Sequence, residues 1–354
     1  MIPALASNIM RETYYTPQRV TPLQDSALLI QDPIYGQVRI QDSILVDLIQ
    51  CRSMQRLKGV LQHGITGLIG ITPPVTRFEH SVGAMLLVRR LGASLDEQIA
   101  ALLHDVSHTA LSHVIDHVFK GERSFHEQQK EAYLTRTEIP DILASYNLDW
   151  HKFVDEEDYP LLEQPAPRLC ADRLDYGLRD SVAFGILKIE QAQNIVEQLV
   201  VQQERIVCSK ANIALELAEA YMEADNLAWS NLHKACLYEL SAKIISDSIS
   251  RGILRMEDLW LKDTEFWMRL TNCDDRDIRD RVQSVSPDTL FIEDESNPSF
   301  KLRLKVRTID PDIADDRRLV LLSELNESYL HKRTQYIESK NKVFFMRIVN
   351  KDSS

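Results

Sequence analysis

Residues 77–128 contain, in succession, RFEHSVG (77–83), LLHDVSH (102–108), TALSHVIDHVF (109–119) and SFHEQ (124–128). Six of the ten histidines of the chain lie in this stretch, namely His80, His104, His108, His113, His117 and His126. Solvated helices are usually filled by Lys and Glu, so a surface role does not account for this concentration of imidazoles. Imidazole together with carboxylate is a ligand set for divalent transition metals. The stretch therefore predicts a metal site.

His104 and Asp105 are adjacent and directly follow the apolar run IAALL. Neighbouring residues of a helix point about 100° apart, so both side chains can reach one ion only near a helix end or kink. His80 upstream and a carboxylate further downstream would complete a set of two imidazoles and two carboxylates. Imidazole suits Fe, Ni, Co or Zn, and carboxylate admits Mn or Mg. Such an ion polarises phosphoryl oxygens and activates water, which indicates a metal-dependent phosphohydrolase.

Hydrophobic periodicity predicts a mainly α-helical protein. Helices are predicted over residues 42–62, 79–91, 95–103 and 110–119, further helices over 127–165, one over 166–182 and several over 190–285. A β-hairpin is predicted at 27–40, a loop at 286–300, strands at 300–309 and 342–350, and a helix at 319–338. We therefore expect a helical domain over residues 1–285 and a small α/β region over 286–354.

Two of these helices carry polar faces. In helix 110–119, the apolar side chains Leu111, Val114, Ile115 and Val118 face inward, which leaves His113, Asp116 and His117 on the opposite face. In helix 166–182, one stripe contains Asp172, Tyr176, Arg179 and Asp180, with Arg173 beside it. Composition alone favours a solvated, ion-paired surface for this second stripe.

The whole chain has 354 residues and a formal net charge of −12. This charge argues against duplex nucleic acid as the main partner, because phosphate-backbone binding needs a basic surface, but it is compatible with small phosphorylated substrates. No apolar run approaches the roughly 20 residues that span a bilayer, and no secretory signal is evident. Five scattered cysteines fit a reducing compartment, so we expect a cytosolic, or cytosolic and nuclear, protein.

The motifs together resemble the HD-domain phosphohydrolases, and within them the deoxynucleoside-triphosphate triphosphohydrolase branch. The resemblance rests on RFEHSVG, LLHDVSHTALSH, FHEQ and ADRLDYGLRD, with support from QDPIYGQVRI (31–40) and MQRLKGVLQHG (54–64). It covers about residues 28–185. It implies a helical HD-domain fold, usually oligomeric, one divalent transition metal and hydrolysis of a deoxynucleoside triphosphate to deoxynucleoside and triphosphate. Mg²⁺ could accompany the substrate phosphates.

The resemblance also implies a role for each matching residue. The metal ligands would be His80, His104, Asp105 and Asp172. His126 would be the general acid, Asp116 would orient it and raise its pKa, and His108 and His113 would contact phosphate. Arg77 and Arg173 would neutralise phosphate charge, while Gln62, Tyr176 and Asp180 would meet the sugar.

Other residues have plainer interpretations. His117 is expected to be a surface or structural histidine, and Cys170 to be core. His63 is a weaker candidate for lining the pocket, and Arg179 is expected to be an ion-pair partner. Two alternative functions stay open: a nucleotide phosphomonoesterase with the same metal site, and a nucleotide-binding regulator without turnover. A regulator would be expected to lose His126 or Asp116, and both are present.

Overall fold

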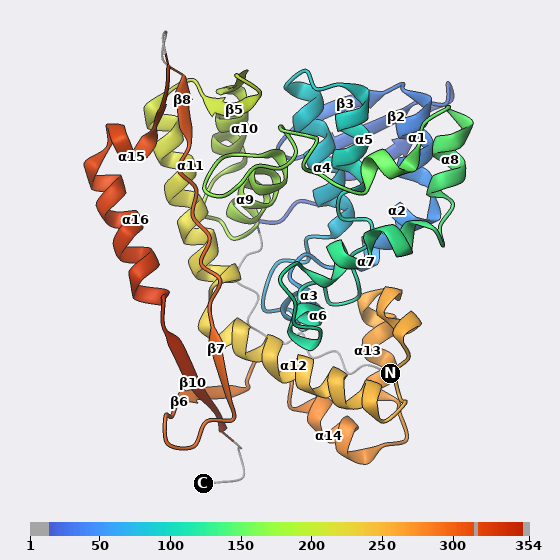
Figure 1. The fold of residues 1–354 in the computed structure, drawn as a ribbon, viewed down its shortest axis with the longest axis vertical. Helices are drawn as coiled ribbons and strands as arrows, with labels where there is room; N and C mark the ends of the chain where they lie inside the picture. Colours follow the sequence, from blue (N-terminus) through green and yellow to red (C-terminus); the bar gives the residue numbers. More distant parts are fainter. Residues whose placement is uncertain (1–13, 315–317, 350–354) are drawn as a thin grey trace.

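The computed structural model describes residues 14–314 and 318–349, which form a mainly α-helical fold with three small sheets (Figure 1). The α-helices are α1 (Ser43–Gln50), α2 (Arg52–Arg56), α3 (Gly64–Leu68), α4 (Arg77–Arg90), α5 (Leu95–Leu103), α6 (Val114–Val118), α7 (Phe125–Leu134), α8 (Ile139–Ser145), α9 (Ala171–Ala183), α10 (Ile189–Glu197), α11 (Ala211–Ala224), α12 (Leu232–Ser250), α13 (Asp263–Thr271), α14 (Arg276–Gln283), α15 (Leu322–Leu325) and α16 (Glu327–Lys340). Shorter helical turns are η1 (Leu57–Gly59), η2 (Trp150–Phe153), η3 (Asp225–Trp229, π-helical) and η4 (Met256–Trp260). The described part of the chain contains no helix long and apolar enough to cross a membrane.

The ten strands form three sheets, with the orders β1-β2-β3, β6-β10-β7 and β4-β5-β8-β9. They are β1 (Arg19–Pro22), β2 (Leu28–Asp32), β3 (Gly36–Ile40), β4 (Leu199–Gln202), β5 (Arg205–Cys208), β6 (Leu290–Glu293), β7 (Phe300–Arg303), β8 (Asp312–Ala314), β9 (Leu319–Leu321) and β10 (Val343–Val349). β2 and β3 confirm the hairpin predicted at residues 27–40. The β4–β5 hairpin is a correction, because only helices were predicted between residues 190 and 285.

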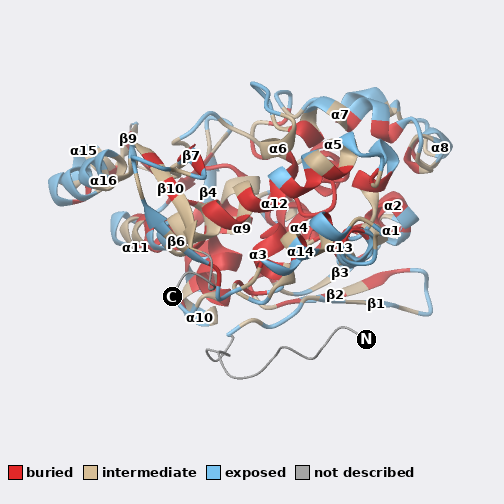
Figure 2. Cartoon of the chain, turned by 90° about the horizontal axis from the view of Figure 1, so that it is seen from below, coloured by how far each residue is buried: buried red, intermediate tan, exposed pale blue. Residues whose placement is uncertain are grey.

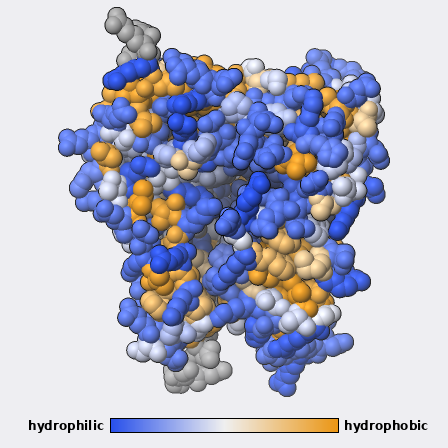
Figure 3. All heavy atoms as spheres, in the orientation of Figure 1, coloured by the Kyte–Doolittle hydropathy of each residue, from blue (hydrophilic) through white to orange (hydrophobic). Residues whose placement is uncertain are grey.

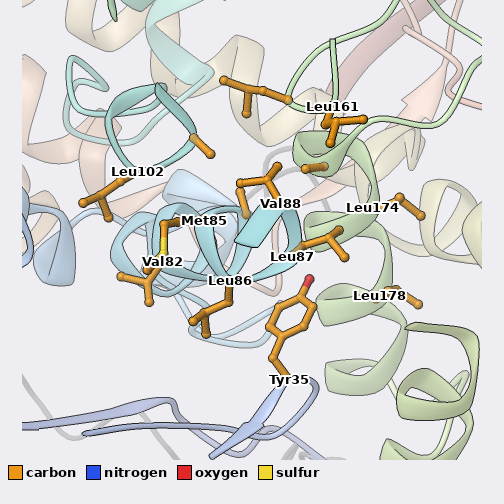
Figure 4. Close-up of a cluster of buried hydrophobic side chains, with 14 of the residues drawn as sticks. Tyr35, Val82, Met85, Leu86, Leu87, Val88, Leu102, Leu161, Leu174 and Leu178 are labelled. Atoms are coloured by element: carbon orange, nitrogen blue, oxygen red, sulfur yellow. The ribbon is translucent and has the colours of Figure 1, made fainter. Parts of the chain in front are cut away.

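Helix α4 lies at the centre of the fold and is buried on nearly all sides (Figure 2). Its start is set by a capping box, in which Thr76 and Glu79 satisfy each other's backbone amides. Figure 4 shows its apolar side chains between α5 and α9: Val82, Met85, Leu86, Leu87 and Val88 beside Leu102, Leu174 and Leu178. Gly83 allows α9 to come this close, because a Cβ there would lie 2.0 Å from Asp175 Oδ1.

The helix predicted over residues 42–62 is broken, which corrects that expectation. Cys51 adopts an extended conformation with ψ 154°, so α1 ends at Gln50 and α2 begins at Arg52. The backbone N–H and the hydroxyl of Ser53 both donate to the carboxylate of Glu138, at 2.9 and 3.1 Å. This contact spans 85 residues, so local periodicity could not have revealed it.

The helix predicted over residues 110–119 is also shorter than expected and begins only at Val114. Leu111 and Ser112 have φ angles of 60° and 49°, in the left-handed region. Two contacts hold this turn: Leu111 N–H donates to Asp263 at 2.8 Å, and Leu111 O packs closely on Gly64. A side chain at Gly64 would collide with that carbonyl, since its Cβ would lie 2.2 Å away. The turn directs residues 108–113 toward the cavity described below.

The C-terminal elements depart from prediction in several places. The first three residues of the helix predicted over 319–338 form strand β9, and the rest is divided at Asn326 into α15 and α16. β6 lies inside the loop predicted at 286–300, and the strand predicted over 300–309 ends at Arg303. Beyond Arg303 the chain passes alongside α9 and α11 before it enters β8 (Figure 1). Ile309, Ile313 and Tyr329 belong to the same hydrophobic core as α4 and α9. The division of the chain at residue 285 stays a prediction.

Candidate metal centre and substrate cavity

Four side chains from three helices converge on one point, and we call them the metal cluster: His80, His104, Asp105 and Asp172. His80 lies on α4, His104 and Asp105 follow the last turn of α5, and Asp172 lies in the first turn of α9. His80 Nε2 is 3.1 Å from His104 Nε2 and 2.9 Å from Asp172 Oδ1. The carboxylate of Asp105 lies 3.7 Å from both imidazoles. The helix end at His104 thus brings both members of the HD pair to one point, as predicted.

The outer nitrogens of both imidazoles are fixed by hydrogen bonds. His80 Nδ1 donates to Asp175 Oδ2 at 2.8 Å, and His104 Nδ1 donates to the carbonyl oxygen of Ala101 at 2.7 Å. Each Nε2 is therefore the nitrogen left to bind an ion in the cluster, toward which two carboxylates also point. Two imidazoles and two carboxylates are a ligand set that fits a divalent transition metal, which would take the place of the protons on the imidazoles. Asp175 was not among the predicted site residues, although it follows Asp172 by three positions.

Charges around the cluster favour a cation. Burial opposes the charged form of His80, but the bonds to Asp172 and Asp175 outweigh burial and raise the pKa of His80 to about 10. Burial also opposes ionisation of Asp105, but Arg77 and the nearby imidazoles hold its pKa well below the usual range. The guanidinium of Arg77 lies 2.7 Å from Asp105 Oδ2. Burial opposes ionisation of Asp172 as well, but its contacts with His104 and His80 lower its pKa, so both carboxylates of the cluster are anionic at neutral pH.

Three further histidines form a second cluster on the same cavity, which we call the imidazole group: His108, His113 and His126. The rings of His108 and His126 stack with centroids 3.6 Å apart, and His113 meets His108 edge to face. Burial lowers the pKa of all three, most strongly for His108 and His126. His108 Nε2 lies 3.2 Å from Asp105, yet neither of its buried ring nitrogens has an aligned hydrogen-bond partner in the described residues.

Asp116 corrects the predicted pairing with His126. Its Oδ2 bonds Nδ1 of His113 at 2.9 Å, one helical turn away, and its Oδ1 accepts the backbone N–H of Phe125 at 2.7 Å. His126 instead stacks on His108, and burial together with that neighbour lowers its pKa, whereas a raised pKa was predicted. The carboxylate of Asp116, which we expected to pair with His126, is therefore paired with His113.

A cavity of about 780 Å³ opens beside both clusters, and Figure 3 shows the corresponding face of the molecule. Among the predicted substrate residues, Gln62, Arg77, His113, Arg173 and Tyr176 line it. Arg173, which is expected to neutralise phosphate charge, is already engaged by protein groups. Its guanidinium lies 3.0 Å from Glu163 and also donates to the carbonyl oxygens of Arg168 and Gln164.

Asp180 is fully buried behind the cavity wall, which corrects its predicted contact with the sugar. It accepts from His63 Nε2 at 3.0 Å and from the indole N–H of Trp229 at 2.7 Å. His63 and Trp229 line the cavity themselves. Asp180 thus orients two wall residues, and His63 belongs to the pocket.

Three further residues that the sequence singled out, His117, Arg179 and Cys170, lie at the cavity edge or are buried. His117 bonds Glu239 at 2.7 Å at the cavity edge. Arg179 is an ion-pair partner, as predicted, and its guanidinium lies 2.7 Å from Asp175 and 3.1 Å from Asp32. Cys170 is buried in the core.

The cavity wall also contains residues that were not predicted. Tyr221 and Trp229 pack around Tyr176, with Trp229 edge-on to it at 4.8 Å between ring centroids. Residues 303–308 close another side. No spacing rule connects Tyr221 or Trp229 to the histidine motifs. The alternating cations of KLRLKVR (301–307) were visible, but only as a strand pattern.

Comparison with known proteins agrees with this geometry. The HD domain family model matches residues 77–176. The metal-dependent phosphohydrolase cns2 of Cordyceps militaris is 42% identical over 329 residues, which cover 90% of this chain and 94% of that protein. A deoxynucleoside triphosphate triphosphohydrolase homologue of Dictyostelium discoideum is 26% identical over 203 residues, covering 49% of this chain and 39% of that protein.

The fold is also found among solved structures. A phosphohydrolase of Bacteroides thetaiotaomicron superposes with a TM-score of 0.66 at 17% identity, covering 94% of this chain and all of that one. The long alignment with cns2 and the match of the HD model to the residues that carry the metal cluster lead to one assignment. The chain belongs to the HD-domain family of metal-dependent phosphohydrolases.

Proposed function

We propose that the substrate is a nucleotide, and that the first candidate reaction is hydrolysis of a deoxynucleoside triphosphate to deoxynucleoside and triphosphate. The observation that carries this proposal is the position of the metal cluster on a cavity whose walls combine imidazoles with the rings of Tyr176, Tyr221 and Trp229. Imidazoles and Arg77 suit phosphate, and aromatic rings suit a nucleoside. The similarity to the Dictyostelium homologue supports the same substrate class.

A divalent metal held by His80, His104, Asp105 and Asp172 would polarise a phosphoryl oxygen and lower the pKa of bound water. His108 is placed to donate to a phosphate oxygen, since its buried nitrogens lack aligned protein partners. Arg77 would neutralise part of the phosphate charge beside Asp105.

The proton for the leaving oxygen is assigned to His113 instead of His126, because Asp116 supports the charged form of His113. Burial lowers the pKa of His113, and the bond from Asp116 opposes that effect. An arriving phosphate adds negative charge and would raise this pKa further. The side chain of His113 is 37% exposed to the cavity, so it can reach substrate.

A nucleotide phosphomonoesterase is the second candidate. It is favoured by the contacts of Arg173, whose guanidinium is already engaged by Glu163 and two carbonyl oxygens. An arginine held this way offers less to a long phosphate chain than an unpaired one.

The deciding experiment incubates the metal-loaded protein with deoxynucleoside and ribonucleoside mono-, di- and triphosphates and identifies the products by mass. Triphosphate with free deoxynucleoside supports the first candidate, and orthophosphate released from monophosphates supports the second. Tight nucleotide binding without any product would indicate that the protein is a nucleotide-binding regulator without turnover. We also propose a homo-oligomer, and light scattering that gives a monomer mass for the fully active protein would contradict it.

A further inference from the structure

One wall of the cavity is formed by residues 303–308, which comprise the last residue of β7 and the segment after it, with the sequence RLKVRT. Arg303, Lys305 and Arg307 alternate with apolar residues along it. In an extended chain such alternation places the three cations on one face. All three line the cavity, together with the intervening Leu304 and Val306. The same cavity is lined by His104, Asp105 and Asp172 of the metal cluster.

In the described residues, these cations differ from Arg77, Arg173 and Arg333, which also line the cavity, in having no acidic partner. Arg77 is paired with Asp105, Arg173 with Glu163 and Arg333 with Asp310. Across residues 14–314 and 318–349, neither Arg303, Lys305 nor Arg307 comes within 4.0 Å of a carboxylate oxygen. The Arg307 guanidinium donates to the carbonyl oxygen of Lys305 at 3.4 Å.

The like charges also act on one another and on the catalytic side of the cavity. The charge of Arg307 is the main cause that lowers the pKa of Lys305, ahead of burial. Burial is the main cause that lowers the pKa of His113, and the charge of Arg307 adds to it. Burial raises the pKa of Tyr176, and the charge of Arg307 opposes that effect, so its field reaches both the imidazole group and the aromatic wall. Glu127 and Asp116 oppose the effect of Arg307 on the pKa of Lys305 from a distance, but neither forms an ion pair with Lys305. Neighbouring cations without a direct carboxylate partner form an attractive position for an anion.

The segment is anchored at both ends. At its start, Arg303 pairs with Val343 in the β7–β10 ladder. After it, Thr308 accepts from Arg333 at 3.0 Å, Asp310 N–H donates to Pro167 O at 2.9 Å, and Asp310 is bonded by Ser323. Ile309 is fully buried between these contacts. The cations are therefore presented from a fixed backbone, and little ordering entropy would be lost when a ligand binds.

We propose that Arg303, Lys305 and Arg307 form a second anion subsite, so that the preferred substrate carries at least one phosphate besides the phosphate at the metal cluster. This inference rests on the proposed nucleotide phosphohydrolase function and narrows its substrate class. Two kinds of nucleotide have the required chemistry. One carries a chain of two or three phosphates, and the other carries a second phosphate elsewhere on its sugar.

The test compares the metal-loaded wild-type protein with a Lys305→Gln, Arg307→Gln double variant. Lys301→Gln is the matched control, because Lys301 lies on the preceding strand β7, is exposed and packs over the ring of Phe345 away from the cavity lining. Substrates are a nucleoside mono-, di- and triphosphate, a nucleoside 3′,5′-bisphosphate and p-nitrophenyl phosphate. Metal content and circular dichroism verify that all variants are folded.

For the preferred multi-phosphate substrate, the double variant should raise KM by about 10- to 100-fold, the range expected for lost charge-assisted hydrogen bonds. The KM for p-nitrophenyl phosphate should stay within about twofold, and the control should match wild type on every substrate. A larger rise in KM for the triphosphate would show that the subsite binds a phosphate of the phosphate chain. A larger rise for the bisphosphate would show that it binds the second phosphate on the sugar. Equal effects on all substrates, or none, would overturn the subsite.

A binding measurement separates this subsite from the proposed reaction. Inorganic tripolyphosphate is titrated into each metal-loaded protein by calorimetry, with orthophosphate as the comparison. The wild type should prefer tripolyphosphate, and the double variant should lose about 10-fold or more of that affinity. If no ester is hydrolysed but this preference holds, the proposed function fails and the subsite stands. If the double variant binds tripolyphosphate like wild type, the subsite is wrong whatever the protein hydrolyses.

Discussion

The metal cluster and the imidazole group meet at Asp105, but the balance of carboxylate and imidazole differs between them. In the metal cluster, His80 and His104 face Asp105 and Asp172, and carboxylate contacts raise the pKa of both imidazoles despite burial. In the imidazole group, the rings of His108 and His126 face each other and have no carboxylate of their own beyond Asp105, so burial lowers the pKa of both.

This difference shows that buried histidines of one sequence motif can have opposite charge preferences. The surplus of carboxylate makes one cluster a site for a cation. The neutral, closely packed imidazoles of the other can donate hydrogen bonds to an anion without first losing a protein partner. His113 lies between these cases, because it belongs to the imidazole group and yet has a carboxylate, Asp116.

The largest effect is expected when the carboxylate shared by both clusters is removed. Asp105→Ala should reduce metal affinity and activity together, by more than the roughly 100-fold that is typical for the loss of an outer-sphere partner. It also leaves Arg77 buried without its partner, so Asp105→Asn, which keeps an oxygen for Arg77, controls for folding. Elemental analysis measures the bound metal. Full metal occupancy in both Asp105→Ala and His104→Ala would show that the ligand assignment is wrong.

The second largest effect is expected when the proton donor is removed, and the loss of kcat distinguishes His113 from His126 in this role. His113→Ala should lose about 10²- to 10⁴-fold in kcat, the usual contribution of a general acid, and His126→Ala should lose less. Asp116→Asn should lower kcat moderately and shift the alkaline limb of the pH–rate profile to lower pH. The reason is that its bond raises the pKa of His113, so the imidazolium would lose its proton earlier without it.

Steady-state kinetics between pH 5 and 9 on all three variants measure this, with metal content as the control for site integrity. If His126→Ala loses more kcat than His113→Ala, the general acid is His126, as the family resemblance implies. That outcome would also contradict the idea that a carboxylate partner selects the donor.

Much of the fold was predictable because it depends on short-range periodicity. The apolar positions of residues 95–103 predicted α5 with its observed bounds, and the HD pair was expected at the helix end where it lies. The features that escaped prediction depend on contacts between distant residues. Glu138 ends the helix at Cys51, and Asp263 and Gly64 hold the turn at Leu111.

The candidate site shows the same limit. The motif residues were predicted to come together and do so, but the partner of Asp116 depends on how α6 and α7 meet, which spacing alone does not specify. Asp180 follows the same helical stripe as Asp172 and Tyr176, yet burial behind His63 and Trp229 removes it from the cavity surface. Helical periodicity identifies a face of a helix and cannot say which part of that face is covered.

A smaller effect on the metal cluster is expected from Asp175, the carboxylate behind His80. Asp175→Asn should lower metal affinity by about 10- to 100-fold, because the fixed tautomer and basicity of His80 depend on this bond. The matched control is Asp180→Asn on the same helix, which is also buried but contacts His63 and Trp229 and should leave metal affinity unchanged. Titration of the metal-free proteins measures both affinities. Equal losses in the two variants would mean that general damage to α9, and not the bond to His80, is responsible.

The last prediction concerns Asp263, which supports the imidazole group. It is tested through the stability of the protein and not through catalysis. Asp263 accepts the backbone N–H groups of Leu61 and Leu111, both at 2.8 Å, and so holds the chain segments that lead to Gln62 and His113. Burial raises the pKa of Asp263 to about 6, against the opposing effect of these two bonds. In the unfolded chain its pKa is about 3.9. The folded state therefore binds more protons between these values, and the stabilising contribution of the protonated group is lost as pH rises through about 6.

Asp263→Asn removes this titration, so the difference in unfolding free energy between wild type and variant should shrink as pH rises from about 4 to 7. A shift of about two pKa units corresponds to roughly 2–3 kcal/mol between these limits. Urea unfolding at a series of pH values measures the difference, in which the titration of all other groups largely cancels. A difference that does not change with pH would mean that Asp263 is ionised in the folded protein throughout. The turn at Leu111 would then be held by a charged carboxylate even below pH 6, where the raised pKa predicts a protonated one.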